Sequence, residues 1–194
     1  MIITISGTPG SGKSTVAKIL LQKLNAERIY VGGIRRELAR EKGMTLQELN
    51  FYAETHPETD VDVDQKAAAE ARALEKKSKV VIVEGRTQFH FLPESIKVFI
   101  KVDPTVGAQR IWKDLQSKST QQERNEGNIH SLEETKRSTA EREEIDAKRY
   151  LKYYSIDHRD QSQYDLVLDS TKESAEEIAN RVLKYLQAKK LIAK

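Results

Sequence analysis

The sequence predicts an α/β fold of three layers, in which helices flank a five-stranded parallel sheet. Five β-rich segments alternate with segments of helical periodicity, and they lie at residues 2–6, 28–31, 79–84, 96–102 and 164–169. Residues 80–83 are apolar throughout, as in strands that helices cover on both faces. Strands that alternate with helices favour a parallel sheet with right-handed crossovers, whose ligands bind at the carboxyl ends of the strands.

The first of these strands leads into the octet Gly-Thr-Pro-Gly-Ser-Gly-Lys-Ser at residues 7–14. The octet has the G-x-x-x-x-G-K-[ST] pattern of a phosphate-binding loop, and a helical pattern follows it directly. Glycines let backbone N–H groups turn toward phosphate oxygens, and the start of the helix adds partial positive charge. The alternative, a glycine-rich turn without a ligand, leaves the position of the octet between a strand and a helix unexplained.

This loop predicts a P-loop NTPase fold that binds ATP together with Mg²⁺. Lys13 is expected to reach the β- and γ-phosphates, and the Ser14 hydroxyl is expected to ligate the metal. The expected cofactor contacts in the loop are Gly7, Thr8, Pro9, Gly10, Ser11, Gly12, Lys13, Ser14 and Thr15. Glu84 ends the third strand beside the loop, where a carboxylate can hold a Mg²⁺-bound water or orient the loop. Capping of the following turn is the alternative role for Glu84.

The overall composition is that of a well-solvated helical enzyme. The 194 residues carry 33 basic and 30 acidic side chains, a balance that gives no support to a nucleic-acid-binding surface. The lack of cysteine excludes a disulfide framework and a cysteine-based metal site. No apolar run approaches the roughly 20 residues of a membrane span, and the first strand begins too early to leave room for a signal peptide. We expect a cytoplasmic monomer without membrane or nucleic-acid partners.

Two segments lie outside the expected sheet and its covering helices. Residues 33–77 are largely helical, and we interpret them as the region that binds the acceptor of the phosphoryl group. Residues 114–138 are polar, with almost no apolar side chain between 121 and 128. A linker would also be polar, but helical, core-quality sequence resumes on both sides. We therefore predict that residues 114–138 form a lid within a single domain that spans residues 1–194.

Arginines at the strand ends and near the lid indicate a second phosphate site. Transfer to a phosphorylated acceptor brings two anions together, and arginine binds phosphate oxygens in pairs without losing its charge. Arg36 follows the second strand, Arg86 follows the third, and Arg142 and Arg149 flank the lid. Exposed helical arginines are commonly solvated surface residues, which is the alternative for residues such as Arg110 and Arg124.

Taken together, these motifs resemble those of cytidylate kinases. The chain combines the phosphate loop with Glu84-Gly85-Arg86 and with Arg142-x3-Asp146-x2-Arg149-Tyr150. The short archaeal-type enzymes are the most similar, because they share the Gly-Met-x-Leu-x-Glu turn at residues 43–48 and the Tyr-Ala-Glu at residues 52–54. The resemblance covers nearly the whole chain. One departure lies at residues 32–36, which read Gly-Gly-Ile-Arg-Arg where the family usually has Gly-Asp-Ile-Phe-Arg.

The resemblance implies ATP-dependent phosphorylation of CMP or dCMP to CDP or dCDP by in-line transfer. The implied catalytic residues are Lys13, Arg86, Arg142 and Arg149. Arg110 is implied to lie near ATP, and the implied acceptor contacts are Arg36, Asp64, Gln65, Arg86, Asp146 and Arg149. Asp64 and Gln65 are the candidates for reading the edge of cytosine. Asp60 and Asp62 are at least as consistent with a solvated, acidic start of the same helix.

Other functions remain open at this point. An adenylate kinase or a dephospho-coenzyme A kinase would share the architecture and the paired arginines. A regulatory or RNA-associated ATPase would share only the phosphate loop, and the paired arginines argue against it. His90 is a candidate substrate contact, but nothing pairs it with a ligand set, so a packed or hydrogen-bonded histidine is favoured.

Overall fold

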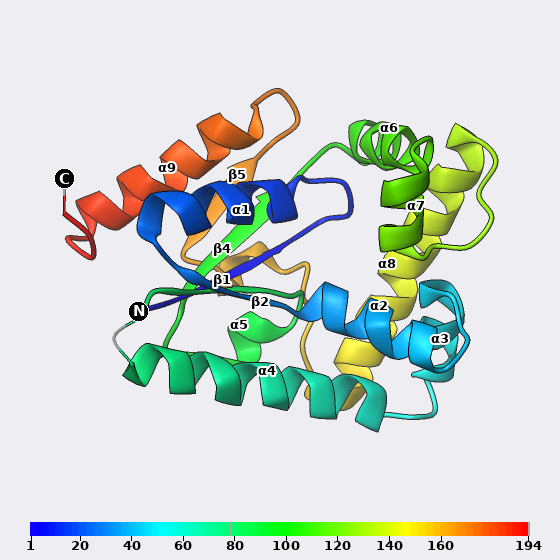
Figure 1. Cartoon of the computed structure of the whole chain (residues 1–194), viewed down its shortest axis with the longest axis horizontal. Coiled ribbons are helices and arrows are strands. Elements are labelled where there is room, and N and C mark those ends of the chain that lie inside the picture. The colour runs from blue at the N-terminus through cyan, green and yellow to red at the C-terminus, as the bar shows by residue number, and fades with distance from the viewer. Residues whose placement is uncertain (78, 194) are drawn as a thin grey trace.

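The computed structural model describes residues 1–77 and 79–193, and its centre is a parallel sheet between helices (Figure 1). The strands run in the order β2-β3-β1-β4-β5. Their bounds are β1 Ile2–Gly7, β2 Glu27–Tyr30, β3 Val81–Glu84, β4 Ile96–Lys101 and β5 Leu166–Asp169. Each predicted strand is present within two residues of its expected ends. The predicted three-layer α/β fold is therefore confirmed.

Alternating side chains of β1 supply both halves of the core. Ile3 and Ile5 point to one face, where they pack with helices α1 (Lys13–Leu24) and α9 (Ala175–Ala188). Ile2 points to the other face, which is covered by α4 (Glu58–Lys76) and the short α5 (Gln88–Phe91) (Figure 1). All six residues of β1 are buried, including the polar Thr4 and Ser6, as in a strand covered on both faces.

The final helix illustrates how local sequence sets an element. Ser174 and Glu177 form a reciprocal capping box, which satisfies free N–H groups in the first turn of α9. Ile178, Val182 and Leu186 follow at intervals of four, and all three are buried against the sheet. Helix α9 therefore forms with its apolar stripe facing inward.

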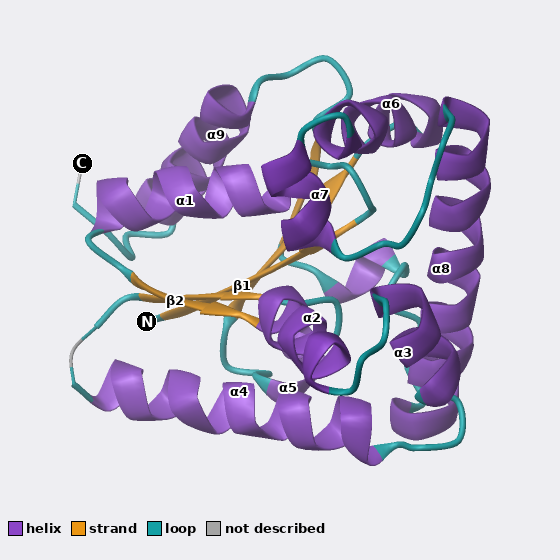
Figure 2. Cartoon of the chain, turned by 45° about the vertical axis from the view of Figure 1, so that its right-hand side comes forward, coloured by secondary structure: helices purple, strands orange, loops and turns teal. Residues whose placement is uncertain are grey.

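Five helices lie beyond the carboxyl ends of the strands and enclose the space there. They are α2 (Val31–Glu41), α3 (Leu46–Tyr52), α6 (Pro104–Leu115), α7 (Lys118–Arg124) and α8 (Leu132–Tyr154). Figure 2 shows α8 standing across the open end of the three layers. A short 3₁₀ turn, Gln161–Gln163, leads from α8 toward β5. Within the described residues, no helix combines the length and the apolar character that crossing a bilayer requires.

Candidate active site

The phosphate loop joins β1 to α1 and packs tightly against α6. Gly10 has a φ of 73°, in the left-handed region, and a β-carbon placed there would lie 2.3 Å from the carbonyl oxygen of Gly107. Only glycine fits this position, because of both the backbone conformation and the close approach. Helix α1 begins at Lys13, so the free N–H groups of its first turn lie beside the loop. The Lys13 ammonium donates to the carbonyl oxygen of Thr8 at 3.1 Å.

A cavity of about 370 Å³ opens next to this loop. Its volume lies within the range of small-molecule sites. The phosphate loop, α2, the end of β3 and helices α6 to α8 all contribute to its wall. Seven basic side chains line it: Lys13, Arg35, Arg36, Arg86, Arg110, Arg124 and Arg142. Five acidic side chains line it as well: Asp60, Asp64, Glu84, Asp114 and Asp146. The excess of positive charge suits an anionic ligand.

Two buried carboxylates hold the arginines in place. Asp60 accepts hydrogen bonds from Arg35 on α2 and from Arg149 on α8, the latter from Nε at 2.8 Å. Asp146 accepts from Nη2 of Arg149 at 2.7 Å and from Nη1 of Arg86. The result is a continuous chain of ion pairs that joins α2, α4, α8 and the loop after β3.

These buried charges shift the pKa values of Asp146 and Lys13. Burial alone would raise the pKa of Asp146, but Arg86, Arg149 and Arg142 together hold that pKa well below its usual range. Burial lowers the pKa of Lys13 to about 7, and the charges of Arg86 and Arg142 add to the effect. The charged form of Lys13 is therefore disfavoured in the ligand-free site, and a bound anion would favour it.

The structure brings most of the predicted site residues to the cavity. The loop residues Pro9, Gly10, Gly12, Lys13, Ser14 and Thr15 line it, together with Arg36, Asp64, Glu84, Arg86, Arg110, Arg142 and Asp146. Arg36 donates from Nη1 to the hydroxyl of Tyr30 at 2.8 Å and from Nε to the carbonyl of Arg124 at 2.9 Å. Arg110 is tied to the carbonyl of Ser170 at 2.7 Å and so braces the loop against the end of β5.

Arg149 is a correction to the predicted site. Its side chain is 1% exposed and does not line the cavity. Its nitrogens donate to Asp60, to Asp146 and to the carbonyl of Asn50. Each of the three guanidinium nitrogens thus donates to an acceptor of the protein in the ligand-free structure. Arg149 instead positions the two carboxylates that hold Arg35 and Arg86.

The acidic start of α4 also differs from expectation. Asp60 is buried and ion-paired, so the solvated interpretation fails for it, while Asp62 is exposed as that interpretation requires. Gln65 is exposed and lies away from the cavity wall, so it is not placed to read a base. Asp64 does line the cavity. The next residue along a helix turns by about 100°, which is why Asp64 and Gln65 diverge.

Asp64 is engaged by its neighbours rather than left free for a ligand. One carboxylate oxygen accepts from the Thr87 hydroxyl at 2.8 Å and from the Tyr154 hydroxyl at 3.0 Å. The other oxygen accepts from Nε2 of Gln88 at 2.9 Å. Burial raises the pKa of Asp64 to about 6, although these hydrogen bonds oppose the shift. Asp64 therefore links α4 to the segment that follows Arg86.

Glu84 retains one oxygen that a metal-bound water could use. Its Oε1 accepts from Nε of Arg28, whereas its Oε2 is buried without a partner in the part of the chain described. Ser14 lies near the start of α1 and also lines the cavity. The described residues contain no cluster of three or more carboxylate, histidine or cysteine ligands. One hydroxyl and one water-mediated carboxylate fit Mg²⁺, which keeps several waters and binds substrate phosphates.

The contacts of two arginines beside the cavity, Arg35 and Arg124, could not be predicted from the sequence. Arg35 follows the second strand together with Arg36, where an arginine is expected to serve the second phosphate site, but it donates instead to Asp60 and, from Nη2, to Asn50 at 3.0 Å. Arg124 was treated as a candidate surface residue, yet it lines the cavity. Its Nη2 donates to Glu126 at 3.0 Å. His90, in contrast, is exposed, packs edge-on against Phe91 and lies outside the cavity wall, in keeping with the favoured interpretation.

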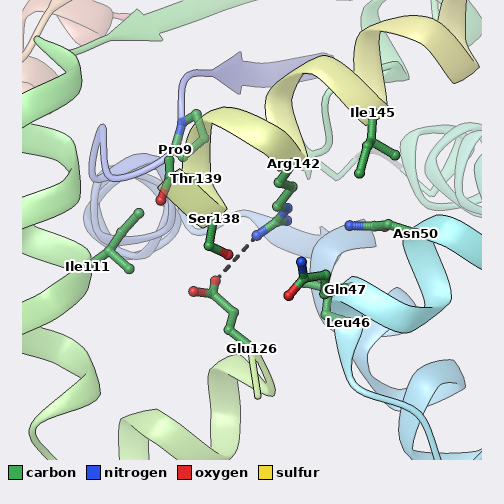
Figure 3. Close-up of a pocket in the computed structure, with 10 residues that line it drawn as sticks. All are labelled: Pro9, Leu46, Gln47, Asn50, Ile111, Glu126, Ser138, Thr139, Arg142 and Ile145. Carbon is green, nitrogen blue, oxygen red and sulfur yellow. Dashed lines mark hydrogen bonds and ion pairs between the residues drawn. The ribbon is translucent and has the colours of Figure 1, made fainter. Parts of the chain in front are cut away.

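Glu126 lies in a second, much smaller pocket of about 20 Å³ next to the main cavity. Figure 3 shows the Arg142 guanidinium pointing toward the Glu126 carboxylate, with the loop residue Pro9 on one side and Asn50 of α3 on another. Nη1 of Arg142 lies 3.3 Å from Oε1 of Glu126. The two spaces share four lining residues, which therefore border both: Pro9, Leu46, Asn50 and Arg142.

The chain is similar in sequence to a protein family and to curated relatives. Residues 3–131 match the family described as an AAA domain. A cytidylate kinase from Archaeoglobus fulgidus is 41% identical over 192 residues, which cover 98% of this chain and 97% of that relative. A cytidylate kinase from Pyrococcus abyssi is 36% identical over 177 residues, which cover 91% of this chain and 88% of that relative.

Solved structures agree on the architecture. A shikimate kinase from Acinetobacter baumannii, in complex with shikimate, has a TM-score of 0.59 and 17% identity, covering 98% of this chain and 95% of that one. An uncharacterized protein from Eubacterium ventriosum has a TM-score of 0.67 and 16% identity, covering 96% and 98%. At such low identity these likenesses establish the fold alone.

Proposed function

This chain belongs to the cytidylate kinase family, and from that premise we propose that it transfers the γ-phosphoryl group of ATP to CMP or dCMP. The observation that carries the proposal is the basic cavity at the carboxyl ends of the strands, bounded on one side by the phosphate loop. Two phosphates must meet there, and the arginines offer the charge that their approach requires.

We propose that the donor phosphates lie on the phosphate loop. The first-turn N–H groups of α1 and the Lys13 ammonium would hold the β- and γ-phosphates. Mg²⁺, held by the Ser14 hydroxyl and through water by Oε2 of Glu84, supplies further neutralisation of the phosphate charge when bound. Arg110 would stay on the ATP side, where it already braces the loop through Ser170.

The acceptor phosphate is assigned to Arg36 and Arg86, and Arg142 is assigned to the transferred group. All three line the cavity, and Asp146 fixes Arg86 through a direct ion pair. An oxygen of the acceptor phosphate would attack the γ-phosphorus in line with the bond to the bridging oxygen, which breaks as ADP leaves, so the protein's contribution is position and charge. Residues 114–138 would act as the lid, and residues 33–77 as the acceptor-binding region. Closure would exclude water and so limit hydrolysis of ATP.

Base selection is assigned to Asp60 and Arg35. A carboxylate can accept from the N4 amino group of cytosine, and a guanidinium can donate to N3 or O2. Asp60 and Arg35 are already ion-paired and both line the cavity. Asn50, which accepts a hydrogen bond from Arg35, keeps that guanidinium in place.

A coupled assay of ADP release tests the function. ATP and Mg²⁺ are supplied with CMP, dCMP, UMP, AMP, GMP or dTMP as acceptor. Turnover with CMP or dCMP should exceed turnover with AMP and GMP by at least about a hundredfold, because a site built for one base edge leaves polar groups unpaired with another. Preference for AMP, or ATP hydrolysis that ignores every monophosphate, would refute the proposal.

A further inference from the structure

We propose that Glu126 is an internal stand-in for a nucleotide phosphate, which occupies the anion position between Arg124 and Arg142 in the free protein and leaves it when nucleotide binds. The inference rests on the proposed function, since it assumes that Arg142 meets a substrate phosphate. It adds a displaceable anion, supplied by the chain itself, to a site that otherwise consists of cations and their fixed carboxylate partners.

The first support is the way Glu126 bridges the two arginines. Its Oε1 lies 3.0 Å from Nη2 of Arg124 and 3.3 Å from Nη1 of Arg142. A single carboxylate oxygen thus serves two guanidinium groups that come from different elements, α7 and α8. The Glu126 side chain is only 12% exposed, so water screens these contacts weakly. Phosphate, with three peripheral oxygens, could serve both arginines more completely.

The second support is that Arg124 and Arg142 each have an N–H donor that no hydrogen bond within the described residues uses. Nε of Arg124 and Nε of Arg142 are each buried without a hydrogen-bond partner within the described ranges 1–77 and 79–193. Among the residues that the structure describes, no carboxylate lies closer to Arg142 than Glu126 at 3.3 Å, since Asp146 lies 3.9 Å from Nε of Arg142 and is shared with Arg86 and Arg149. Buried donors without partners are costly, so the site gains when a ligand with more acceptor oxygens takes the place of Glu126.

The third support is the backbone that delivers Glu126. Asn125 ends α7 with a φ of 49°, and Gly127 has a φ of 80°, so Glu126 stands between two left-handed residues. The carbonyl of Asn125 accepts from the N–H of Leu46 at 2.8 Å, and Arg36 donates to the carbonyl of Arg124. The end of α7 is thus anchored on the acceptor-binding region, which places the Glu126 carboxylate against Arg142 without any ligand.

The charges around Arg142 explain why Glu126 binds there in the free protein and leaves when a phosphate binds. Arg86 lies near Arg142, and burial together with Arg86 lowers the pKa of Arg142 to about 10. The free cavity therefore needs an anion near Arg142, and Glu126 provides one. A bound phosphate would be repelled by a carboxylate at that place, so Glu126 and phosphate exclude each other.

Glu126→Gln tests the exchange, because removing a contact made only in the free protein must tighten binding. The melting temperature of the ligand-free variant should fall, while its affinity for ATP–Mg²⁺ or for CMP, measured by titration calorimetry, should rise about tenfold. The nucleotide whose affinity rises identifies the phosphate that displaces Glu126. Glu123→Gln is the matched control, because Glu123 is exposed and forms no ion pair with the described residues.

A lower melting temperature combined with a higher nucleotide affinity distinguishes displacement of Glu126 from a purely structural role. If Glu126 only positions the arginines, melting temperature and both affinities will fall together or stay unchanged, and the inference is overturned. ATP binding does not depend on the identity of the acceptor. A chain that phosphorylates some other monophosphate would therefore contradict the proposed function while leaving the ATP arm of this test intact.

Discussion

Arg149 on α8 and Asp60 on α4 form an ion pair in which both side chains are almost completely buried, with Nε 2.8 Å from Oδ2. The pair joins the helix that covers one face of the sheet to the helix that stands across the end of the layers. Arg149 does not line the cavity, whereas Asp60 does. The pair therefore serves the site by fixing the distance between α4 and α8.

Asp60→Asn should destabilise the fold by about 3–5 kcal/mol, because it leaves Arg149 and Arg35 with one fewer buried counter-charge. The free energy of unfolding in urea at neutral pH measures the effect. Asp62→Asn is the control, since Asp62 is exposed on the same helix, and it should change stability by less than about 0.5 kcal/mol. Equal effects of the two substitutions would contradict the role assigned to the pair.

Lys13→Met should reduce turnover by at least about a hundredfold without unfolding the chain, because Lys13 contacts the loop and the cavity rather than the apolar core. The coupled ADP assay and circular dichroism give the two readouts. Lys18→Met provides the comparison, since Lys18 is an exposed residue of the same helix. A Lys13 variant that keeps more than about a tenth of wild-type turnover would rule out the phosphate-holding role.

ATP binding at pH 8.5 should take up close to one proton. The pKa of Lys13 is about 7 in the free protein, so most of the Lys13 side chains are neutral at pH 8.5, and phosphate charge should restore the pKa toward its ordinary value. Calorimetric titrations in two buffers of different ionisation enthalpy report the uptake. Lys13→Met should abolish it, and at pH 5.5 it should vanish in the wild type because Lys13 is already charged. Unchanged uptake in the variant would assign the proton elsewhere.

Arg86→Ala should lower kcat/KM for CMP by about 30- to 1000-fold, which corresponds to roughly 2–4 kcal/mol for one charge-assisted phosphate contact. The affinity for ATP should change far less. Arg181→Ala is a suitable control, since Arg181 is an exposed residue of α9 paired with Glu173. Loss of ATP affinity with unchanged acceptor kinetics would mean that the two phosphate sites are reversed.

The amide hydrogen exchange of residues 114–138 should slow when ATP and CMP are bound together. The decrease should be larger than with ATP alone. The segment has little apolar surface of its own, so its order depends on contacts with α2, α3 and the bound phosphates. Hydrogen–deuterium exchange by mass spectrometry measures the change. Strong protection in the free protein that no ligand alters would identify the segment as a fixed structural element instead.

The fold could be predicted from the sequence because its signals are local. The phosphate loop, the apolar residues 80–83 and the stripe of Ile178, Val182 and Leu186 each define an element within a few residues. Alternation of strands and helices then leaves few topologies open. The predicted sheet, its covering helices and the position of the loop all follow from such short patterns.

The partners of charged residues were harder to predict. Asp60 and Asp62 stand two positions apart in similar surroundings, yet one is buried and the other exposed. Arg149 is about 90 positions from Asp60 along the chain, and no local pattern links the two. The general preference of charged residues for the surface favours a solvated Asp60, and the buried ion pair with Arg149 of α8 overrides that preference.

The excess of basic over acidic side chains around the cavity has different consequences for nucleotide association and for base selectivity. A recess lined by unbalanced charge focuses its field outward, so any polyanion is drawn toward it from a distance, at a rate that falls as ionic strength rises. That attraction does not depend on which base the nucleotide carries. Discrimination between bases must act at short range, and we propose that it depends on whether the base forms hydrogen bonds with Asp60 and Arg35. The association rate should therefore be high for any nucleotide, and selectivity should lie in the dissociation rate.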